Sequence, residues 1–445
     1  MVIEITELFD QNPWWKDKEK IEEDYDIIKW KSKKHRWIPD IKDKISLKPF
    51  ALHIITGPRQ AGKTTLFKLM IKELIEKREP KSIFYFNCEN VSDHKELTEI
   101  LKLYLEFKED NKIKNSLIFL DEITSPLEWY KTLKFFIDKG DFKDDVLLVT
   151  GSSSISVKKH VELFPGRRGN GKDFIIYPLS FRGFIKIIEP DLIKKIPIIT
   201  NLEEINRRVT NALLYEKELN NYLKKYMGYG GFPLSIANLN QPKEEAKNIY
   251  LSWIKNAILK SDRSDLIARQ IIKILVETQQ SDISWENISK KIEIKSPKTV
   301  ASYIELLNSI FVINILYNID ISGKSIKFGK NKKIHFKDPL LFDIFEEWAL
   351  TETRNKYSAI AESLVAEHLC RAFPGKVFFW KNKQEIDAVV LEKNRIYGFE
   401  VKWKEKSEKI KYPNQFKEIY LITKKEFSKK PLKIPLSVFL VMIDV

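Results

Sequence analysis

No other part of this 445-residue chain narrows the choice of fold as much as the stretch GPRQAGKTT, residues 57–65. It occupies every fixed position of the pattern G-x-x-x-x-G-K-[ST], in which backbone N–H groups and a helix N-terminus face phosphate oxygens. The pattern needs a strand before it and a helix after it. The apolar run FALHIITG and the periodic run KTTLFKLMIKELIEK suit these two roles. The motif therefore predicts a parallel α/β domain that binds a nucleotide.

The residues of this stretch have separate expected roles. Gly57 and Gly62 let the backbone curl around the phosphates. Lys63 is expected to reach the β- and γ-phosphates, and Thr64 to bind Mg²⁺. ATP with Mg²⁺ is thus the expected ligand. The predicted nucleotide-binding residues are Gly57, Pro58, Arg59, Gln60, Ala61, Gly62, Lys63, Thr64 and Thr65.

Two further apolar runs end in groups that suit this site. LIFLDE places Asp121 and Glu122 at the end of a strand. Asp121 is expected to hold Mg²⁺ and Glu122 to polarise the attacking water, although an exposed acidic strand end is the alternative. LLVTGSSS ends the next strand with hydroxyl groups, and Ser152 or Ser153 is expected to sense the γ-phosphate.

The turn FPGRRGN, residues 164–170, contains two neighbouring arginines, Arg167 and Arg168. A guanidinium directed at the γ-phosphate of an adjacent subunit accelerates hydrolysis by orders of magnitude. Either arginine is therefore a candidate for a finger supplied in trans. An ordinary loop on a basic protein is the equal alternative.

The pattern along the chain divides it into five expected segments. An apolar fraction of 43% is enough to fill several cores. The first segment holds four tryptophans among dense charges, and these are expected to pack it onto a neighbouring domain. The segments are an N-terminal arm (1–45), a doubly wound α/β P-loop core (46–190), a helical lid (191–262), a winged helix-turn-helix (263–340) and an α/β restriction-endonuclease-like domain (341–445).

The last segment has carboxylates and a lysine at the spacing of a metal-dependent nuclease. Glu400 and Lys402 in FEVKW share one face of a strand, and a hairpin would bring Asp387 of EIDAVV alongside. With Glu362 on the helix AESLVAEHL, they follow the order of a PD-(D/E)xK nuclease-like site, which would hold Mg²⁺ or Mn²⁺. Glu385 is either a spare ligand or a solvated residue. Such domains also serve as inactive binding modules, so cleavage stays open.

A net charge of +15, from 77 basic and 62 acidic residues, favours a polyanion as partner. A uniformly basic proteome is the alternative explanation of that charge. The third helix of the expected winged helix-turn-helix has few Arg, Asn or Gln residues for reading bases, so little sequence preference is expected. The alternative is a winged helix that contacts protein and whose lysines are solvated. The residues expected to contact DNA are Lys290, Lys291, Lys295, Lys298, Ser302, Lys330, Lys332 and Lys333, with Thr299 and Tyr303 facing the same groove.

Several of these stretches together resemble a known family. GPRQAGKTTL, LDEI followed by a Trp, TGSSS, GRR and YPLSFRGF are similar to archaeal and bacterial AAA+-type ATPases that join such a core to a winged helix and a nuclease-like C-terminal domain. The resemblance covers most of residues 10–445. It implies the use of ATP and Mg²⁺ and, in many members, assembly into homo-oligomers.

The leading interpretation is a cytoplasmic, Mg²⁺-dependent ATPase that acts on DNA. An ATP-gated switch that assembles with protein partners is the main alternative, and a nuclease licensed by its ATPase is a third. The two cysteines, Cys88 and Cys370, fit a reducing cytosol. No apolar run approaches the roughly 20 residues that a membrane span needs.

Overall fold

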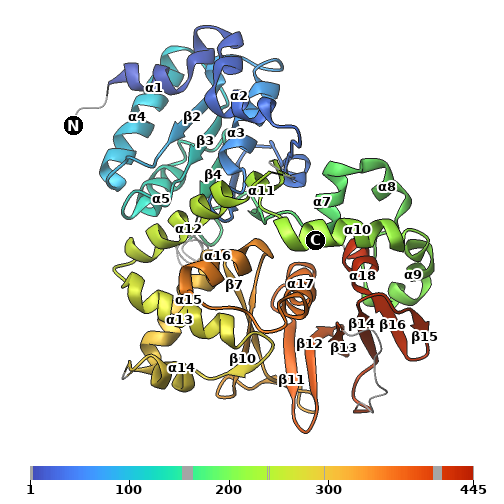
Figure 1. Cartoon of the computed structure of the whole chain (residues 1–445). Helices are drawn as coiled ribbons and strands as arrows, with labels where there is room; N and C mark the ends of the chain where they lie inside the picture. The colour runs from blue at the N-terminus through green and yellow to red at the C-terminus, as the bar shows by residue number, and fades with distance from the viewer. Residues whose placement is uncertain are drawn as a thin grey trace. The chain divides into compact units, whose positions relative to one another are not determined.

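The computed structural model describes residues 4–152, 164–237, 239, 241–294, 296–403 and 413–443. The chain forms two compact units, residues 1–177 and 178–445, and each is described by itself (Figure 1). The finer division into five segments stays a prediction. Ser153 and Lys295 lie outside the described residues. Within the part described, no helix is long and apolar enough to span a membrane.

A five-stranded parallel sheet forms the centre of the first unit. Its strand order is β2-β3-β4-β1-β5, so β4 lies between the P-loop strand β1 and β3. β1, β3 and β4 are buried along their whole length, as apolar runs covered on both faces should be. The strands are β1 (Ala51–Thr56), β2 (Ile83–Asn87), β3 (Leu117–Asp121), β4 (Val146–Gly151) and β5 (Asp173–Ile175).

Helices cover both faces of this sheet. Helices α4 (His94–Asp110) and α5 (Trp129–Lys139) lie on one side, and α2 (Tyr25–Ser32) and α3 (Lys63–Leu74) lie on the other (Figure 1). Helices α3, α4 and α5 bury apolar residues in the same core as the strands, and α2 packs on α3, which leaves the edge that follows the carboxyl ends of the strands for loops. The expected α/β core with a parallel central sheet is therefore confirmed.

The N-terminal arm packs on the edge strand β2. Trp14 and Trp15 are buried, and both indole N–H groups donate to the Ile83 carbonyl, at 3.1 and 2.9 Å. The Asn12 side chain donates to the Tyr85 carbonyl at 2.9 Å and accepts from the Tyr85 N–H at 2.7 Å. An amide side chain thus satisfies the free edge as a neighbouring strand would. The arm comprises α1 (Ile5–Gln11), η1 (Pro13–Trp15), η2 (Lys18–Glu23), α2 and η3 (Asp40–Lys44).

The second unit begins with a helical stretch interrupted by glycines. A Cβ on Gly230, whose φ is 71°, would lie 1.9 Å from Asp338 Oδ1. The Asp338 carboxylate accepts from the N–H groups of Gly231, at 2.6 Å, and Leu340, at 2.9 Å. The glycines therefore allow α10 to end against α16. The helices are α7 (Phe181–Ile188), α8 (Pro190–Lys195), η5 (Leu202–Glu204), α9 (Ile205–Leu213), α10 (Glu216–Tyr229), α11 (Pro233–Ala237), α12 (Glu244–Leu259) and α16 (Leu340–Ala349).

Between α12 and α16, three helices accompany a small antiparallel sheet of order β6-β10-β7. Ser264 and Ser284 cap α13 and α14 by accepting from backbone N–H groups. Pro297 stands in the first turn of α15 as expected, although the Ser296 side chain makes no capping bond. The elements are α13 (Asp265–Glu277), β6 (Asp282–Ile283), α14 (Trp285–Lys291), α15 (Pro297–Ser309), β7 (Ile313–Tyr317), β8 (Ile319–Asp320), β9 (Ser325–Ile326) and β10 (Lys332–Phe336).

The C-terminal part of this unit is a six-stranded sheet of order β11-β12-β13-β14-β16-β15. Its first three strands run antiparallel, whereas β13, β14 and β16 are parallel neighbours. Helix α17 (Lys356–Ala372) contacts β10 of the small sheet as well as β12 and β13 of this one. The remaining elements are β11 (Val377–Lys381), β12 (Glu385–Glu392), β13 (Arg395–Lys402), β14 (Glu418–Thr423), β15 (Ser428–Lys429), β16 (Leu432–Pro435) and α18 (Leu436–Met442).

Candidate functional site

The P-loop connects the end of β1 to the start of α3. A Cβ on Gly57 would lie 2.3 Å from the carbonyl oxygen of Ile176, the residue after β5. The loop can therefore approach the backbone there only with glycine at this position. Gln60 and Gly62 have left-handed backbones, with φ of 61° and 89°. Gly62 leads directly into α3, whose first residue is Lys63. The N–H groups of that helix end therefore face the loop, the arrangement that binds phosphate.

Lys63 lies inside the loop, with 4% of its surface exposed. Its Nζ donates to the carbonyls of Gly57 and Pro58, each at 3.0 Å, and stands 3.6 Å from Glu122 Oε1. Two of these three partners are neutral acceptors. An ammonium bonds more strongly to a charged phosphate oxygen than to a carbonyl, so these contacts are exchangeable for a nucleotide.

Asp121, at the end of β3, is fully buried among hydroxyl groups. Its Oδ2 accepts from Thr64 Oγ1 at 2.6 Å and from the Tyr85 hydroxyl at 3.2 Å, and its Oδ1 accepts from Thr150. Burial raises the pKa of Asp121, and the threonine hydroxyls oppose that rise. The two expected Mg²⁺ ligands, Thr64 and Asp121, thus lie within one hydrogen bond of each other. Their hard oxygen donors fit that ion.

Thr150 on β4 is a residue that the sequence reasoning missed. Its hydroxyl donates to Asp121 and accepts from the Glu122 N–H at 2.9 Å. It therefore orients the Asp121 carboxylate and holds the backbone of Glu122, which is left-handed with φ of 49°. Thr150 is visible in the run LLVTGSSS, but it lies within the strand, whereas the hydroxyls expected at the site lie after it. Ser152 is half-buried, two residues beyond Thr150.

The two candidate finger arginines have different surroundings. Arg167 makes an exposed bidentate pair with Asp138 of α5, with distances of 2.5 and 3.1 Å. Arg168 is more enclosed: its Nε donates to the Leu52 carbonyl at 3.2 Å and it also pairs with Asp173. Arg168 thus contacts both β1 and β5, whereas Arg167 forms an ion pair at the surface. The trans-acting role stays a prediction for both.

Most of the lysines expected to contact DNA are on the surface. Lys290, Lys291, Lys298 and Lys330 are exposed, as contacts with phosphates require. Ser302 is half-buried, and its hydroxyl donates to the Thr299 carbonyl at 3.0 Å.

Three other residues do not face a groove as expected. Tyr303 is buried and its hydroxyl accepts from the Ser264 N–H at 2.8 Å. Lys332 is 8% exposed, with Nζ 5.1 Å from the centre of the Trp285 ring, and Lys333 is 1% exposed. The expectation that these two lysines contact DNA was therefore wrong. The physical reason is that β10 already begins at Lys332, so both lysines belong to a strand of the small sheet.

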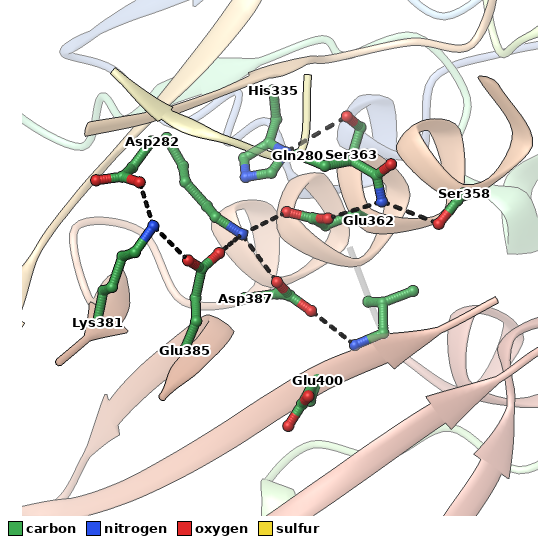
Figure 2. Close-up of polar contacts among 12 residues, drawn as sticks. Gln280, Asp282, His335, Ser358, Glu362, Ser363, Lys381, Glu385, Asp387 and Glu400 are labelled. Atoms are coloured by element: carbon green, nitrogen blue, oxygen red, sulfur yellow. Dashed lines mark hydrogen bonds and ion pairs between the residues drawn. The ribbon is translucent and has the colours of Figure 1, made fainter. Parts of the chain in front are cut away.

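Lys333 enters the acidic cluster that was expected to bind a metal. Its Nζ lies 2.7 Å from Glu362 Oε1, 2.5 Å from Glu385 Oε1 and 2.8 Å from Asp387 Oδ1. Figure 2 shows these three carboxylates, from α17 and β12, turned toward one another. Burial acts to lower the pKa of Lys333, but the carboxylates outweigh it and hold the pKa well above its usual value.

The second oxygen of each carboxylate also has a donor. Glu362 Oε2 accepts from Gln280 at 3.3 Å, and Glu385 Oε2 pairs with Lys381 at 3.0 Å. Asp387 Oδ2 accepts from the backbone N–H of Val401 at 2.9 Å (Figure 2). Every carboxylate oxygen of Glu362, Glu385 and Asp387 is therefore engaged by the protein itself.

Glu400 and Lys402 lie beside this cluster. Burial acts to raise the Asp387 pKa, and Lys333 and, to a smaller extent, Lys402 lower it. Glu400 is buried and pairs with Lys402 on its own strand, and Figure 2 shows it apart from the other carboxylates. The β12–β13 ladder ends with Ala388 opposite Phe399, and beyond it Asp387 turns to the Val401 N–H. Among the residues that the structure describes, no group of three or more His, Cys, Asp or Glu could hold a metal ion. The expected site of Glu362, Asp387, Glu400 and Lys402 thus does not fit a divalent metal.

Three stretches of the chain match known families. Residues 50–185 match the family described as AAA domain. Residues 220–345 and 357–435 match two domains of unknown function, DUF8612 and DUF4143. No curated protein matches the chain. The first unit therefore contains an AAA-type P-loop domain, which confirms that part of the resemblance seen in the sequence.

Solved structures of other proteins show a distant likeness. A Walker-type ATPase of Pyrococcus abyssi is 13% identical, with 66% of this chain and 91% of that chain covered, at a TM-score of 0.35. The Aeropyrum pernix ORC1 protein in complex with DNA is 12% identical, with coverages of 67% and 86% and a TM-score of 0.34. A point mutant of Thermotoga maritima RuvB is 15% identical, with coverages of 62% and 84% and a TM-score of 0.29. Likeness at this level defines neither an activity nor a partner.

Proposed function

We propose that the protein is a Mg²⁺-dependent ATPase that binds or acts on DNA. The main support for ATP hydrolysis is the hydrogen bond between Thr64 and Asp121, with Glu122 beside Lys63. In this proposal Lys63 binds the β- and γ-phosphates, while Thr64 and Asp121 hold the ion. Bound Mg²⁺ would neutralise charge on the phosphate oxygens.

The chain's own groups would do the rest of the work. Lys63 would exchange the carbonyls of Gly57 and Pro58 for phosphate oxygens, which releases it from Glu122 as well. Glu122 would then be free to orient and polarise the attacking water, with its backbone held by Thr150. Arg167, whose partner Asp138 is exposed, would act on the γ-phosphate of an adjacent copy in a homo-oligomer.

We also propose a winged helix for residues 263–340. The order of α13, β6, α14, α15, β7 and β10, with β10 between the other two strands, supports it. Lys290 and Lys291 are exposed on its second helix and Lys298 on its third, where phosphate contacts of such domains fall. Binding would therefore be sensitive to salt and largely indifferent to sequence.

A separate cleft of about 830 Å³ lies between the loop before β10 and the C-terminal sheet. Its lining includes Lys327 and Lys330 before β10, and Lys381 and Lys383 around the end of β11. The lining also contains amide side chains, Trp380 and two carboxylates, Asp282 and Asp320, which pair with Lys381 and Lys327. The lysines and amides suit a sugar–phosphate backbone. For the C-terminal domain we propose a nuclease-like fold that serves binding.

One observation favours the alternative of an ATP-gated switch with protein partners. Lys332 and Lys333, at one end of the expected wing, are buried and unable to contact DNA. The basic surface is thus smaller than the sequence indicated. In that alternative, nucleotide state changes assembly, and DNA has no effect on turnover.

The test is ATP hydrolysis by the full chain, with and without single-stranded and duplex DNA, and with Lys63→Ala as background. DNA-stimulated turnover would support the proposal, and turnover indifferent to DNA would favour the switch. Absence of hydrolysis above the Lys63→Ala background would overturn the ATPase itself.

A matched pair of variants separates specific contacts from bulk charge. Lys290→Ala/Lys291→Ala removes two lysines from the last turn of α14, and Lys194→Ala/Lys195→Ala removes two from the last turn of α8. The first pair is expected to weaken DNA binding and reduce its salt dependence, because two phosphate contacts are lost. Equal weakening by both pairs would contradict the proposed surface.

A further inference from the structure

The acidic cluster of the second unit already contains a cation. The ammonium of Lys333 lies within 2.8 Å of one oxygen from each of Glu362, Glu385 and Asp387. We propose that Lys333 occupies this cluster permanently in place of a divalent metal, and that the cluster is an ionic latch between the small sheet and the C-terminal domain rather than a cleavage site.

Each carboxylate oxygen of the cluster already has a donor within the protein. A divalent ion in a protein needs several carboxylate or carbonyl oxygens, and Mg²⁺ gives up its own water reluctantly. Here the oxygens of the three carboxylates pair with Lys333 and Lys381 and accept hydrogen bonds from Gln280 and the Val401 N–H. An ion from solution would have to displace a covalently attached ammonium that is 1% exposed.

The position of Lys333 in the fold makes withdrawal difficult. It is the second residue of β10, the central strand of the small sheet, and pairs with Leu316 of β7 and Asp282 of β6. The two ladders fix its backbone, and withdrawing its ammonium would leave three carboxylates without their shared cation. The arrangement therefore acts as a fixed joint rather than a gate.

A second ion pair runs in the opposite direction across the same joint. Lys381 at the end of β11 pairs with Asp282 of β6, and it also reaches Glu385 (Figure 2). The small sheet thus gives an ammonium to carboxylates of the C-terminal domain, and that domain gives one back. Gln280, just before β6, adds hydrogen bonds to Ser358 and Glu362 of α17. DNA held by the proposed winged helix would consequently move together with the C-terminal domain.

The test uses Mn²⁺ binding, measured by electron paramagnetic resonance on the full chain without nucleotide. Wild type and Lys333→Met are compared with Lys332→Met, which removes the adjacent buried lysine but no contact with the cluster. We expect Lys333→Met alone to gain one Mn²⁺ site, because three convergent carboxylates lose their cation. We also expect Mn²⁺ to raise the unfolding temperature of that variant only.

Two further measurements, on wild type and Asp387→Asn, test the latch if Lys333→Met does not fold. The first counts Mn²⁺ sites in wild type and in Asp387→Asn, and equal counts are expected. The second incubates wild type with single-stranded and duplex DNA and Mn²⁺ or Mg²⁺, and no cleavage is expected. A Mn²⁺ site lost in Asp387→Asn, or cleavage lost in that variant, would overturn the latch. Neither result would bear on the ATPase, which is scored by Lys63→Ala.

Discussion

The two units each bury a lysine beside carboxylates, and they use it in opposite ways. Lys63 donates to two neutral carbonyls and stands 3.6 Å from one carboxylate. Lys333 contacts three carboxylates and is 1% exposed. Neutral acceptors give up an ammonium to a phosphate at little cost, but three carboxylates do not. A lysine with carboxylates nearby is therefore a ligand site only when its present partners are weaker than the ligand.

Removing Lys333 should have the largest effect on stability. Lys333→Met leaves three convergent carboxylates without their cation, and breaking a buried pair in this way costs about 3–5 kcal/mol. The loss should appear as a lower urea midpoint for the second unit, followed by circular dichroism. Lys332→Met, which loses one aromatic contact, should cost about 1 kcal/mol. Equal losses in both variants would show that the carboxylate contacts are not special.

Removing Lys63 should act on catalysis rather than on stability. Lys63→Ala is expected to lower ATP turnover by about 10²–10³-fold, the cost of losing one preorganised donor to developing charge. Its urea midpoint should stay close to that of wild type, because its carbonyl partners can bond to water at the open loop. A variant that unfolds as readily as Lys333→Met would erase the contrast between the two lysines.

The sequence was informative wherever the chemistry lies in one contiguous motif. The P-loop residues and the Asp121–Glu122 pair follow directly from two short patterns whose positions in the fold are set by the ends of strands. The parallel sheet followed from short, wholly apolar runs. Within this site Thr150 and Tyr85 were missed, because each lies inside a strand rather than after it.

The acidic cluster could not be predicted in the same way. Its carboxylates are readable from the spacing in the sequence, but the ammonium comes from a residue 54 positions before Asp387. Burial of Lys333 depends on β10 pairing between β6 and β7, which a run of lysines next to a glycine does not indicate. A motif lists the groups that could bind a metal, and packing decides which cation they receive.

Removing the hydroxyl of Thr150 tests how the catalytic carboxylates are held. Thr150→Val leaves one Asp121 oxygen and the Glu122 N–H without this partner, at a cost of about 1–3 kcal/mol for a buried unsatisfied group. Turnover should fall about tenfold, since the Asp121 carboxylate and the backbone of Glu122 both lose a positioning contact. Thr132→Val is the control: its hydroxyl donates to the His94 carbonyl in the same unit, so stability should fall and turnover should not. Reduced turnover in the control would point to general destabilisation.

The smallest predicted effect is a difference in how the two buried aspartates respond to pH. Burial raises the pKa of Asp121. For Asp387 burial also acts upward, but Lys333 outweighs it and lowers the pKa. A raised pKa means that the folded state holds the proton more tightly, so Asp121 costs stability as pH rises above the unfolded value of about 3.9. Asp387 does the reverse: it stabilises above that value, and the stabilisation is lost as pH falls through its lower folded pKa.

Urea unfolding of Asp121→Asn and Asp387→Asn at pH 3 and pH 6, on either side of the unfolded value, measures this difference. Relative to wild type, Asp121→Asn should gain stability as pH rises, because the buried wild-type carboxyl must then lose its proton and the amide has none to lose. Asp387→Asn should be destabilised at both. If both variants shifted with pH in the same direction, the carboxylate beside Lys333 would be no better compensated than the one among hydroxyls, and the contrast between a ligand site and a latch would lose its electrostatic basis.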